Sequence, residues 1–186
     1  MKIRSQKDSE VVDMGFVVWM TGFSGSGKTT IAKWLEEHYK GRGRQVEVLD
    51  GDEIRENLSP GLGFSQEERT AHNKRVIYLA KMLSRNDVIV IVSLISPYKQ
   101  VRNEARDALP KFMEVHVDCP LEVCMDRDVK GLYAKAKAGE IKKMTGLSDT
   151  YEAPESPELI VATHTETIAE SAQKILEKSR ELGFEE

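Results

Sequence analysis

The nine residues from Gly22 to Thr30, GFSGSGKTT, constrain this chain more than any other stretch of it. They match the spacing G-x-x-x-x-G-K-[ST] and lie just after the apolar run FVVWM. Glycines in such a loop let consecutive backbone N–H groups point at phosphate oxygens, and the helix that follows adds partial positive charge at its N-terminus. The pattern predicts a nucleoside triphosphate site in which Lys28 reaches the β- and γ-phosphates and Thr29 offers its hydroxyl to Mg²⁺. The predicted ATP contacts in this loop are Gly22, Ser24, Gly25, Ser26, Gly27, Lys28, Thr29 and Thr30.

Apolar runs of strand length alternate with longer stretches of helical period along the chain. Such alternation is typical of a parallel sheet flanked by helices. Five strands are predicted within residues 16–22, 45–52, 87–97, 111–120 and 159–163, and helices over residues 28–43, 65–86, 121–140 and 166–182. Ser65 and Glu68 form a capping box at the start of the second helix. We therefore expect an α/β chain with the three-layer P-loop NTPase fold, its mostly parallel five-stranded sheet flanked by helices.

Length and charge narrow the class of protein. The 186 residues carry 27 Lys and Arg against 31 Asp and Glu, a formal net charge of −4. This length fits a single domain over residues 1–186, and the acidic balance speaks against nucleic acid as a partner. Cys119 and Cys124 lack the spacing of a zinc or redox pair and are expected to be reduced packing residues. The first 15 residues lack an apolar stretch of signal-peptide length, and no run could span a membrane, so a soluble, cytoplasmic protein is expected.

Triphosphate binding alone is compatible with a GTPase switch, a motor protein or a kinase. A GTPase switch requires a guanine-reading Asn-Lys-x-Asp, whereas Asn73-Lys74 continues to Arg75-Val76. Motors usually carry an apolar strand that ends in an acid pair, whereas the strand VIVIVSLIS ends at Ser96. The small size of the chain favours a kinase of a small molecule.

Two acids, Asp50 and Asp52, stand at the carboxyl end of the second predicted strand. Ligands bind at these ends in open α/β sheets. Acids one residue apart on a strand end point the same way, so the pair could hold Mg²⁺ and take a proton from an attacking hydroxyl. Helix capping by Asp52 is the structural alternative.

The stretch RDVKGLYAKAKAGEIKK, residues 127–143, carries six Lys and Arg side chains against two acids in a chain that is acidic overall. A solvated helix face would explain such a run of charge. A lid that closes over a transferring phosphate explains it better, because the basic charge is concentrated here. We expect a mobile lid over residues 127–150.

Several longer strings narrow the function further. They include LDGDEIR, GLGFSQEERTAHNKR, SLISPYKQVRNEAR and EVHVDCPLEVCMDRDVKGLYAKAKAGEI, followed by MTGLSDTYEAPESPEL. With these motifs the chain resembles the adenylylsulfate kinase family over nearly its whole length. Members of this family use ATP to phosphorylate adenylyl sulfate on its 3′-hydroxyl, and other phosphate-loop kinases do not share the KGLY-x-K-A-x-x-GEI string.

The resemblance implies roles for matching residues. It makes Lys28, Asp52 and Asp50 catalytic, with Asp52 at the acceptor 3′-hydroxyl and Thr29 and Asp50 beside the metal. Arg127 is similar to the lid arginine near ATP. Arg69 and Asn73, four residues apart, fall on one helix face. The residues implied in acceptor binding are Asp52, Arg55, Phe64, Arg69, Asn73, Ile95, Ser96, Lys130, Leu132 and Met144.

Two positions depart from the family pattern. Met144 stands where an aromatic is common before Thr-Gly, which concerns stacking on the acceptor, and Ala162 stands where an acid usually precedes Thr163, which concerns the edge of the ATP base. Ser96 matches a serine that is phosphorylated in some members, although in-line transfer needs only positioning and electrostatics.

The sequence thus predicts a kinase that makes 3′-phosphoadenylyl sulfate from ATP and adenylyl sulfate, with Mg²⁺ as cofactor. A kinase of another small hydroxyl acceptor and a catalytically silent, nucleotide-binding regulatory subunit are the alternatives. A homodimer is expected, an association with ATP sulfurylase is considered, and neither a nucleic acid nor a membrane is expected as a partner.

Overall fold

The computed structural model describes residues 15–185, so the expectation for the N-terminal stretch falls almost wholly outside them. A single five-stranded sheet is formed by β1 (Val17–Thr21), β2 (Val46–Asp50), β3 (Ile89–Ser93), β4 (Phe112–Asp118) and β5 (Leu159–Ala162). The strand order is β2-β3-β1-β4-β5, and each neighbouring pair is parallel. The five predicted strands are confirmed.

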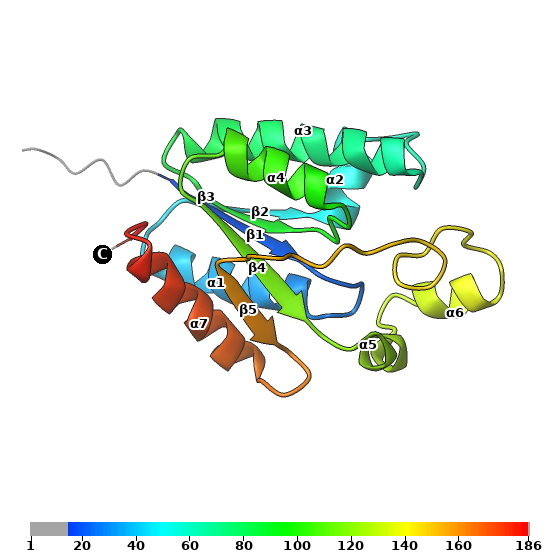
Figure 1. Ribbon diagram of the computed structural model, residues 1–186. Helices are drawn as coiled ribbons and strands as arrows, with labels where there is room; N and C mark the ends of the chain where they lie inside the picture. The colour runs from blue at the N-terminus through cyan, green and yellow to red at the C-terminus, as the bar shows by residue number, and fades with distance from the viewer. Residues whose placement is uncertain (1–14, 186) are drawn as a thin grey trace, which may run out of the picture.

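The helices divide into two layers and a separate pair. They are α1 (Lys28–Gly41), α2 (Gly51–Leu58), α3 (Gln66–Ser84), α4 (Lys99–Ala108), α5 (Leu121–Arg127), α6 (Leu132–Lys137) and α7 (Ile168–Glu181). Figure 1 shows α1 and α7 on one face of the sheet and α3 and α4 on the other, with α2 beside α3. The three-layer arrangement is confirmed. Helices α5 and α6 lie beyond the carboxyl ends of the strands.

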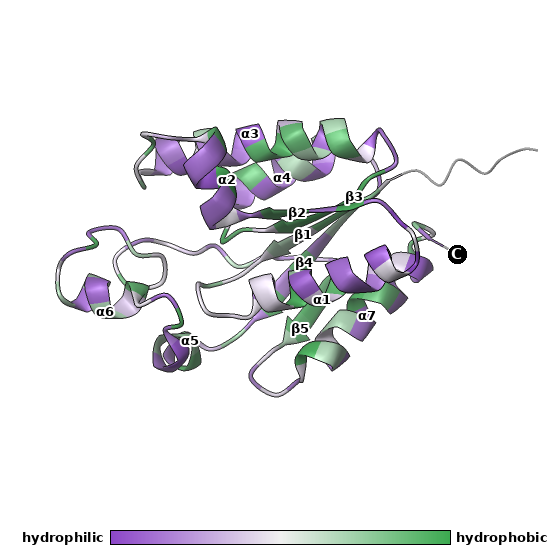
Figure 2. Cartoon of the chain, turned by 180° about the vertical axis from the view of Figure 1, so that it is seen from behind, coloured by the Kyte–Doolittle hydropathy of each residue, from purple (hydrophilic) through white to green (hydrophobic). Residues whose placement is uncertain are grey.

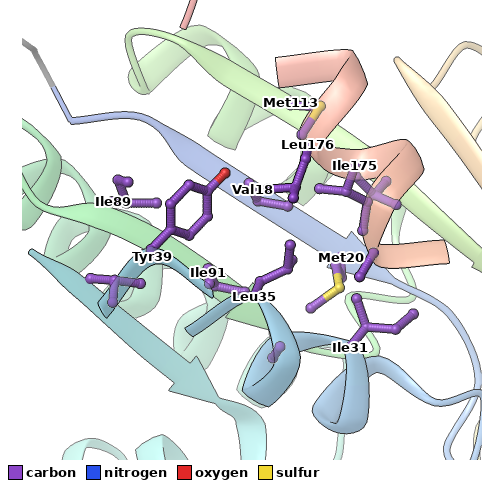
Figure 3. Close-up of a cluster of buried hydrophobic side chains, with 14 of the residues drawn as sticks. Val18, Met20, Ile31, Leu35, Tyr39, Ile89, Ile91, Met113, Ile175 and Leu176 are labelled. Atoms are coloured by element: carbon purple, nitrogen blue, oxygen red, sulfur yellow. The ribbon is translucent and has the colours of Figure 1, made fainter. Parts of the chain in front are cut away.

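Each face of the sheet has its own apolar core, because alternate residues of a strand point to opposite faces. Val18 and Met20 of β1 pack toward α1 and α7, whereas Val17 and Trp19 pack toward α3 and α4. The first core is drawn in Figure 3, where Leu35 and Leu176 approach the same strands from two helices. Figure 2 shows the same division as hydrophobic strands between helices with polar outer faces.

The predicted helix over residues 121–140 is wrong as a single element. The chain leaves helical geometry after α5, where Asp128 and Gly131 have φ angles of 22° and 65°, and starts again as α6. Helices α2 and α4 were not predicted, whereas the capping box of Ser65 and Glu68 at the start of α3 is confirmed.

The strand order creates the place for a site. From β1 the chain crosses to β2 on one side of the sheet, while β4 and β5 lie on the other side, so the order reverses at β1. Ligands of open α/β sheets bind outside the carboxyl end of the sheet at such a point. No helix within residues 15–185 is long and apolar enough to cross a membrane.

Candidate active site

A cavity of about 500 Å³ opens at the carboxyl ends of the strands. Its walls come from the loop after β1, the first turns of α2, the start of α3, the segment after β3, the link between α5 and α6, and the turn before α7. Segments far apart in the sequence therefore meet in one place. The phosphate loop lies between two ends of this cavity, one lined by Phe64, Arg69 and Asn73 and the other by Thr163 and Ile168.

The loop from Gly22 to Gly27 has the backbone that its glycines predict. Gly25 and Gly27 have φ angles of 77° and 100°, in the left-handed region that favours glycine. A Cβ on Gly22 would lie 2.5 Å from the carbonyl oxygen of Val117, so the loop also needs glycine for its close approach to β4. The sequence places Lys28 at the first position of α1, directly after this turn.

Lys28 is buried within its own loop. Its Nζ donates to the carbonyl oxygens of Gly22 at 2.9 Å and Phe23 at 2.6 Å, and to Ser26 Oγ at 3.3 Å. Burial lowers the pKa of Lys28 to about 8, against the opposing effects of Cys124, Asp50 and Asp52. The ammonium is thus held by carbonyl groups of its own loop, where α1 begins.

Asp50 and Thr29 form the pair that could bind a cation. Thr29 Oγ1 donates to Asp50 Oδ2 at 2.8 Å, and both residues line the cavity. Asp50 also caps α2 through Oδ1, which accepts from the Asp52 N–H at 3.2 Å. The capping role considered for Asp52 therefore belongs to Asp50. One hydroxyl and one carboxylate suit Mg²⁺, which takes few protein ligands and completes its shell with water and phosphate oxygens.

No group of three or more His, Cys, Asp or Glu residues that could hold a metal ion occurs in the part of the chain that the structure describes.

Asp52 faces the cavity from the first turn of α2, and its side chain is 70 % exposed. Lys130, from the turn between α5 and α6, forms an ion pair with its Oδ2 atom. The pair joins the basic segment to the acidic end of β2 across the mouth of the cavity. An exposed carboxylate here can accept a proton from a hydroxyl bound beside the phosphate loop.

The side chains of two arginines lie beside the Phe64 ring, which lines the cavity. Phe64 is 50 % exposed, and the Arg55 and Arg69 guanidinium carbons lie 4.8 Å and 5.3 Å from the centroid of its ring. Arg55 Nη1 donates to the Gly63 carbonyl at 2.9 Å, and Arg69 Nε donates to the Phe64 carbonyl at 3.0 Å. An exposed aromatic face beside two guanidinium groups is suited to an anionic ligand with an aromatic ring.

Ser96 and Asn73 are tied together under the same end of the cavity. Ser96 Oγ donates to Asn73 Oδ1 at 3.1 Å and accepts from Trp19 Nε1 at 3.2 Å, and Asn73 Nδ2 donates to the Arg69 carbonyl at 2.8 Å. Ile95 lines the cavity beside them. The Ser96 hydroxyl is therefore engaged in positioning its neighbours.

Arg127, the last residue of α5, lies at the other end of the cavity. Arg127 Nη2 donates to the Thr163 carbonyl at 2.8 Å and its Nη1 donates to the Gly25 carbonyl at 3.3 Å. Thr163 Oγ1 in turn donates to the Ser26 carbonyl at 2.7 Å. Lys130 and Leu132 also line the cavity. The basic segment thus reaches both ends of the cavity.

Three predicted residues do not line the cavity. Gly22 and Ser26 belong to the inner side of the phosphate loop, where Lys28 contacts them. Met144 is 5 % exposed and packs with Cys119, Cys124 and Tyr133 in a small apolar cluster. The geometry therefore does not support Met144 as a stacking partner of an acceptor, because its side chain is buried in this cluster.

Sequence reasoning missed His72, which lines the same cavity as Arg69 and Asn73 and is 2 % exposed. Its Nδ1 lies 2.9 Å from Ser59 Oγ, and its Nε2 has no hydrogen-bond partner in residues 15–185. Burial, followed by the charges of Arg55 and Arg75, lowers its pKa to about 4. Its place three residues after Arg69, on the same helix face, was the signal that could have identified it.

Comparisons with known proteins agree with this geometry. A family model described as adenylylsulphate kinase matches residues 14–162. A probable adenylyl-sulfate kinase of Pyrococcus abyssi is 54 % identical over 170 residues, which are 91 % of this chain and 98 % of the relative. The adenylyl-sulfate kinase of Rippkaea orientalis is 52 % identical over 91 % of this chain and 94 % of its own length. A probable bifunctional SAT/APS kinase of Sorangium cellulosum is 53 % identical, but the match covers only 29 % of its length.

Solved structures give the same result. The APS kinase of Mycobacterium tuberculosis in complex with AMPPNP and APS superposes with a TM-score of 0.85 at 40 % identity, covering 89 % of this chain and 97 % of that one. The shikimate kinase of Aquifex aeolicus superposes with a TM-score of 0.53 at 14 % identity, covering 92 % of this chain and 100 % of that one. The second likeness concerns the fold alone.

Proposed function

Because the chain belongs to the adenylylsulfate kinase family, we propose that it transfers the γ-phosphoryl group of ATP to the 3′-hydroxyl of adenylyl sulfate. The products are ADP and 3′-phosphoadenylyl sulfate, the activated sulfate of sulfate assimilation. The observation that carries this proposal is the single cavity that joins a phosphate loop to an aromatic ring flanked by two arginines. A nucleotide that carries a phosphosulfate group offers both a ring for Phe64 and an anion for Arg55 and Arg69.

ATP would occupy the end between the phosphate loop and Thr163. The loop N–H groups and Lys28 would bind its phosphates, and Arg127 would lie near its base. Mg²⁺, which neutralises charge on the transferring phosphate when bound, would be held by Thr29 and Asp50. The hydrogen bond between these two side chains is compatible with that role, because both residues line the cavity with oxygen-bearing side chains.

Adenylyl sulfate would occupy the other end. The proposed contacts, beyond Phe64 and its two arginines, are Asp52, Asn73, Ile95, Ser96, Lys130 and Leu132, all of which line the cavity. Its 3′-hydroxyl would lie at Asp52, which accepts the proton as the ribose oxygen attacks the γ-phosphorus and the bond to ADP breaks. Lys130 would leave Asp52 for the phosphate oxygens in this step.

We also propose that residues 1–186 act as one domain in which residues 127–150 form a lid. Ion pairing and hydrogen bonds of Lys130 and Arg127 across the cavity support this assignment. Lid closure would exclude water, which is the competing acceptor for the γ-phosphoryl group.

The deciding experiment is a coupled assay of ADP release with a panel of hydroxyl acceptors. Adenylyl sulfate should give turnover far above that of adenosine 5′-phosphate or sugar substrates. Turnover with another acceptor alone would favour the first alternative, and failure with every acceptor would favour a silent regulatory subunit. Asp52→Asn should lower kcat by about 100-fold or more, the scale of general acid–base assistance. Ser96→Ala should retain activity, and a loss as large as that of Asp52→Asn would favour a covalent phosphoserine route.

A homodimer and an association with ATP sulfurylase remain predictions. Light scattering of the purified protein tests the first, and co-elution with the sulfurylase of the same organism tests the second. The cytoplasmic location expected from the sequence is also still a prediction.

A further inference from the structure

We propose that Asp149 is a positioning residue for acceptor binding, because it holds the Arg69 guanidinium in place at the acceptor end of the cavity. The proposal rests on the proposed function. Arg69 has a side chain only 8 % exposed, and its Nε lies 3.3 Å from Asp149 Oδ2. Asp149 itself is not among the residues that line the cavity. It therefore acts on the acceptor through Arg69.

Two nitrogen atoms of the Arg69 guanidinium contact protein groups, and the third is left for a ligand. Its Nε faces Asp149 and donates to the Phe64 carbonyl, and its Nη2 donates to the Lys143 carbonyl at 3.0 Å. Its Nη1 has no hydrogen-bond partner within residues 15–185. Since the arginine fork is planar and rigid, fixing Nε and Nη2 also fixes the direction of Nη1. That donor remains for an anionic acceptor.

Asp149 is itself firmly placed. The Tyr98 hydroxyl donates to its carboxylate, at 3.3 Å to Oδ2, and the Thr150 N–H donates to Oδ1 at 3.0 Å. Its backbone closes a turn in which the Asp149 N–H donates to the Met144 carbonyl at 3.1 Å and the Gly146 N–H donates to the Asp149 carbonyl at 2.9 Å. A carboxylate held from its own turn and from the segment after β3 can fix a mobile partner.

This arrangement connects the lid to the acceptor pocket. Asp149 and Lys143 lie in the lid segment, whereas Arg69 and Phe64 lie at the start of α3. A guanidinium without these partners would be free to rotate away from the Phe64 ring. Acceptor binding would then have to order Arg69 again, at a cost in conformational entropy.

The test is steady-state kinetics of Asp149→Ala and Asp149→Asn with both substrates. Asp149→Ala should raise the KM for adenylyl sulfate about tenfold and change the KM for ATP less than twofold. Asp149→Asn, whose amide oxygen can still accept a hydrogen bond, should give a smaller rise. Glu155→Ala is the matched control: it removes an exposed ion pair with Lys99 farther along the same segment and should change neither KM.

A double-mutant cycle separates positioning from general support of the fold. In an Arg69→Ala background, Asp149→Ala should have no further effect on the KM for adenylyl sulfate, because the group that it orients is gone. An undiminished effect in that background, equal changes in both KM values, or a lowered KM from the loss of a nearby negative charge would each overturn the proposal. Wild-type protein is assayed first, and its failure to turn over adenylyl sulfate would overturn the proposed function instead.

Discussion

Lys28 combines two properties that make its charge depend on pH. It belongs to the phosphate loop, and its burial lowers its pKa to about 8. Above that pH the free enzyme loses the ammonium group that would bind phosphates, so kcat/KM for ATP should fall by about tenfold per pH unit. A pH–rate profile from pH 6 to pH 10 measures this limb.

Lys28→Arg provides the control for this profile. A guanidinium stays charged throughout this range, so the variant should be less active but lack the alkaline limb. A wild-type profile that stays flat to pH 9.5 would contradict the assignment.

The titration of His72 makes the stability of the fold depend on pH. Burial lowers its pKa from 6.5 to about 4, so below pH 6.5 the unfolded chain binds a proton that the folded chain does not. Stability is therefore lost as pH falls from 6.5 toward 4, and by pH 5 the loss from this group is about 2 kcal/mol. Urea unfolding at pH 8 and pH 5 measures the difference. In His72→Gln the difference in unfolding free energy between the two pH values should be smaller by about 2 kcal/mol. An unchanged difference would show that His72 does not titrate in this way.

At the residue scale, local spacing in the sequence predicts only some of the residues of the site. Lys28 and Thr29 follow from the phosphate-loop spacing, and Asp50 and Asp52 follow from their place at a strand end. The residues that hold the side chains of the site in place cannot be predicted from local spacing. The ion pair of Asp149 with Arg69, for example, joins residues 80 positions apart through the tertiary fold.

At the scale of elements, periodicity predicts where a helix can form but not where a polar side chain interrupts it. Residues 121–140 read as one helix because apolar positions recur at helical spacing. In the structure the Asp128 carboxylate accepts from the Tyr133 and Ala134 N–H groups at 3.0 Å and 2.9 Å, so it caps a new helix. Gly131, with φ of 65°, supplies the turn between the two. The break points Lys130 at Asp52, which a continuous helix would not do.

Met144 packs in a small apolar cluster with Cys119, Cys124 and Tyr133, and this packing gives a prediction for Met144. Tyr133 from this cluster donates its hydroxyl to the Ser24 carbonyl in the phosphate loop at 3.0 Å. Met144→Ala would leave a cavity and loosen that contact, so the KM values for ATP and adenylyl sulfate should both rise several-fold. Phe64→Ala should instead raise the KM for adenylyl sulfate about tenfold or more and leave that for ATP unchanged.

Parallel titrations of the two variants with both substrates compare these effects. A rise for adenylyl sulfate alone in Met144→Ala would return this residue to the acceptor pocket, where the family pattern places it. A family correspondence assigns a position along the chain and not the direction of a side chain, so these titrations are needed to assign Met144.

For the whole molecule, the alternation of strands and helices was sufficient to predict the class of fold. A strand such as β3, buried on both faces, reads as a continuous apolar run because helices cover both sides. The strand order β2-β3-β1-β4-β5 cannot be predicted from any single apolar run. It depends on which face each connecting helix packs against, and that choice is made by the two apolar cores together.

One buried arginine joins several of these parts. Arg102 of α4 is 2 % exposed, and its Nε donates to Glu114 Oε1 of β4 at 2.7 Å. Its Nη1 donates to the Ser96 carbonyl at 2.7 Å and its Nη2 to the Glu152 carbonyl at 2.6 Å. It thus ties the segment after β3 and the segment that leads into β5 to strand β4.

Arg102→Met keeps the length of the side chain but leaves Glu114 and two carbonyl groups without this partner. Removing one member of a buried ion pair costs about 3 to 5 kcal/mol, so the free energy of unfolding should fall by about that amount. Lys74→Met is the matched control, because Lys74 pairs with Glu104 of the same helix α4 and its side chain is 55 % exposed. Its loss should be about 1 kcal/mol or less, in the range of exposed pairs. Urea unfolding at pH 7.5 compares the two variants, and equal losses would show that the Arg102 contacts contribute no more to the fold than a surface pair does.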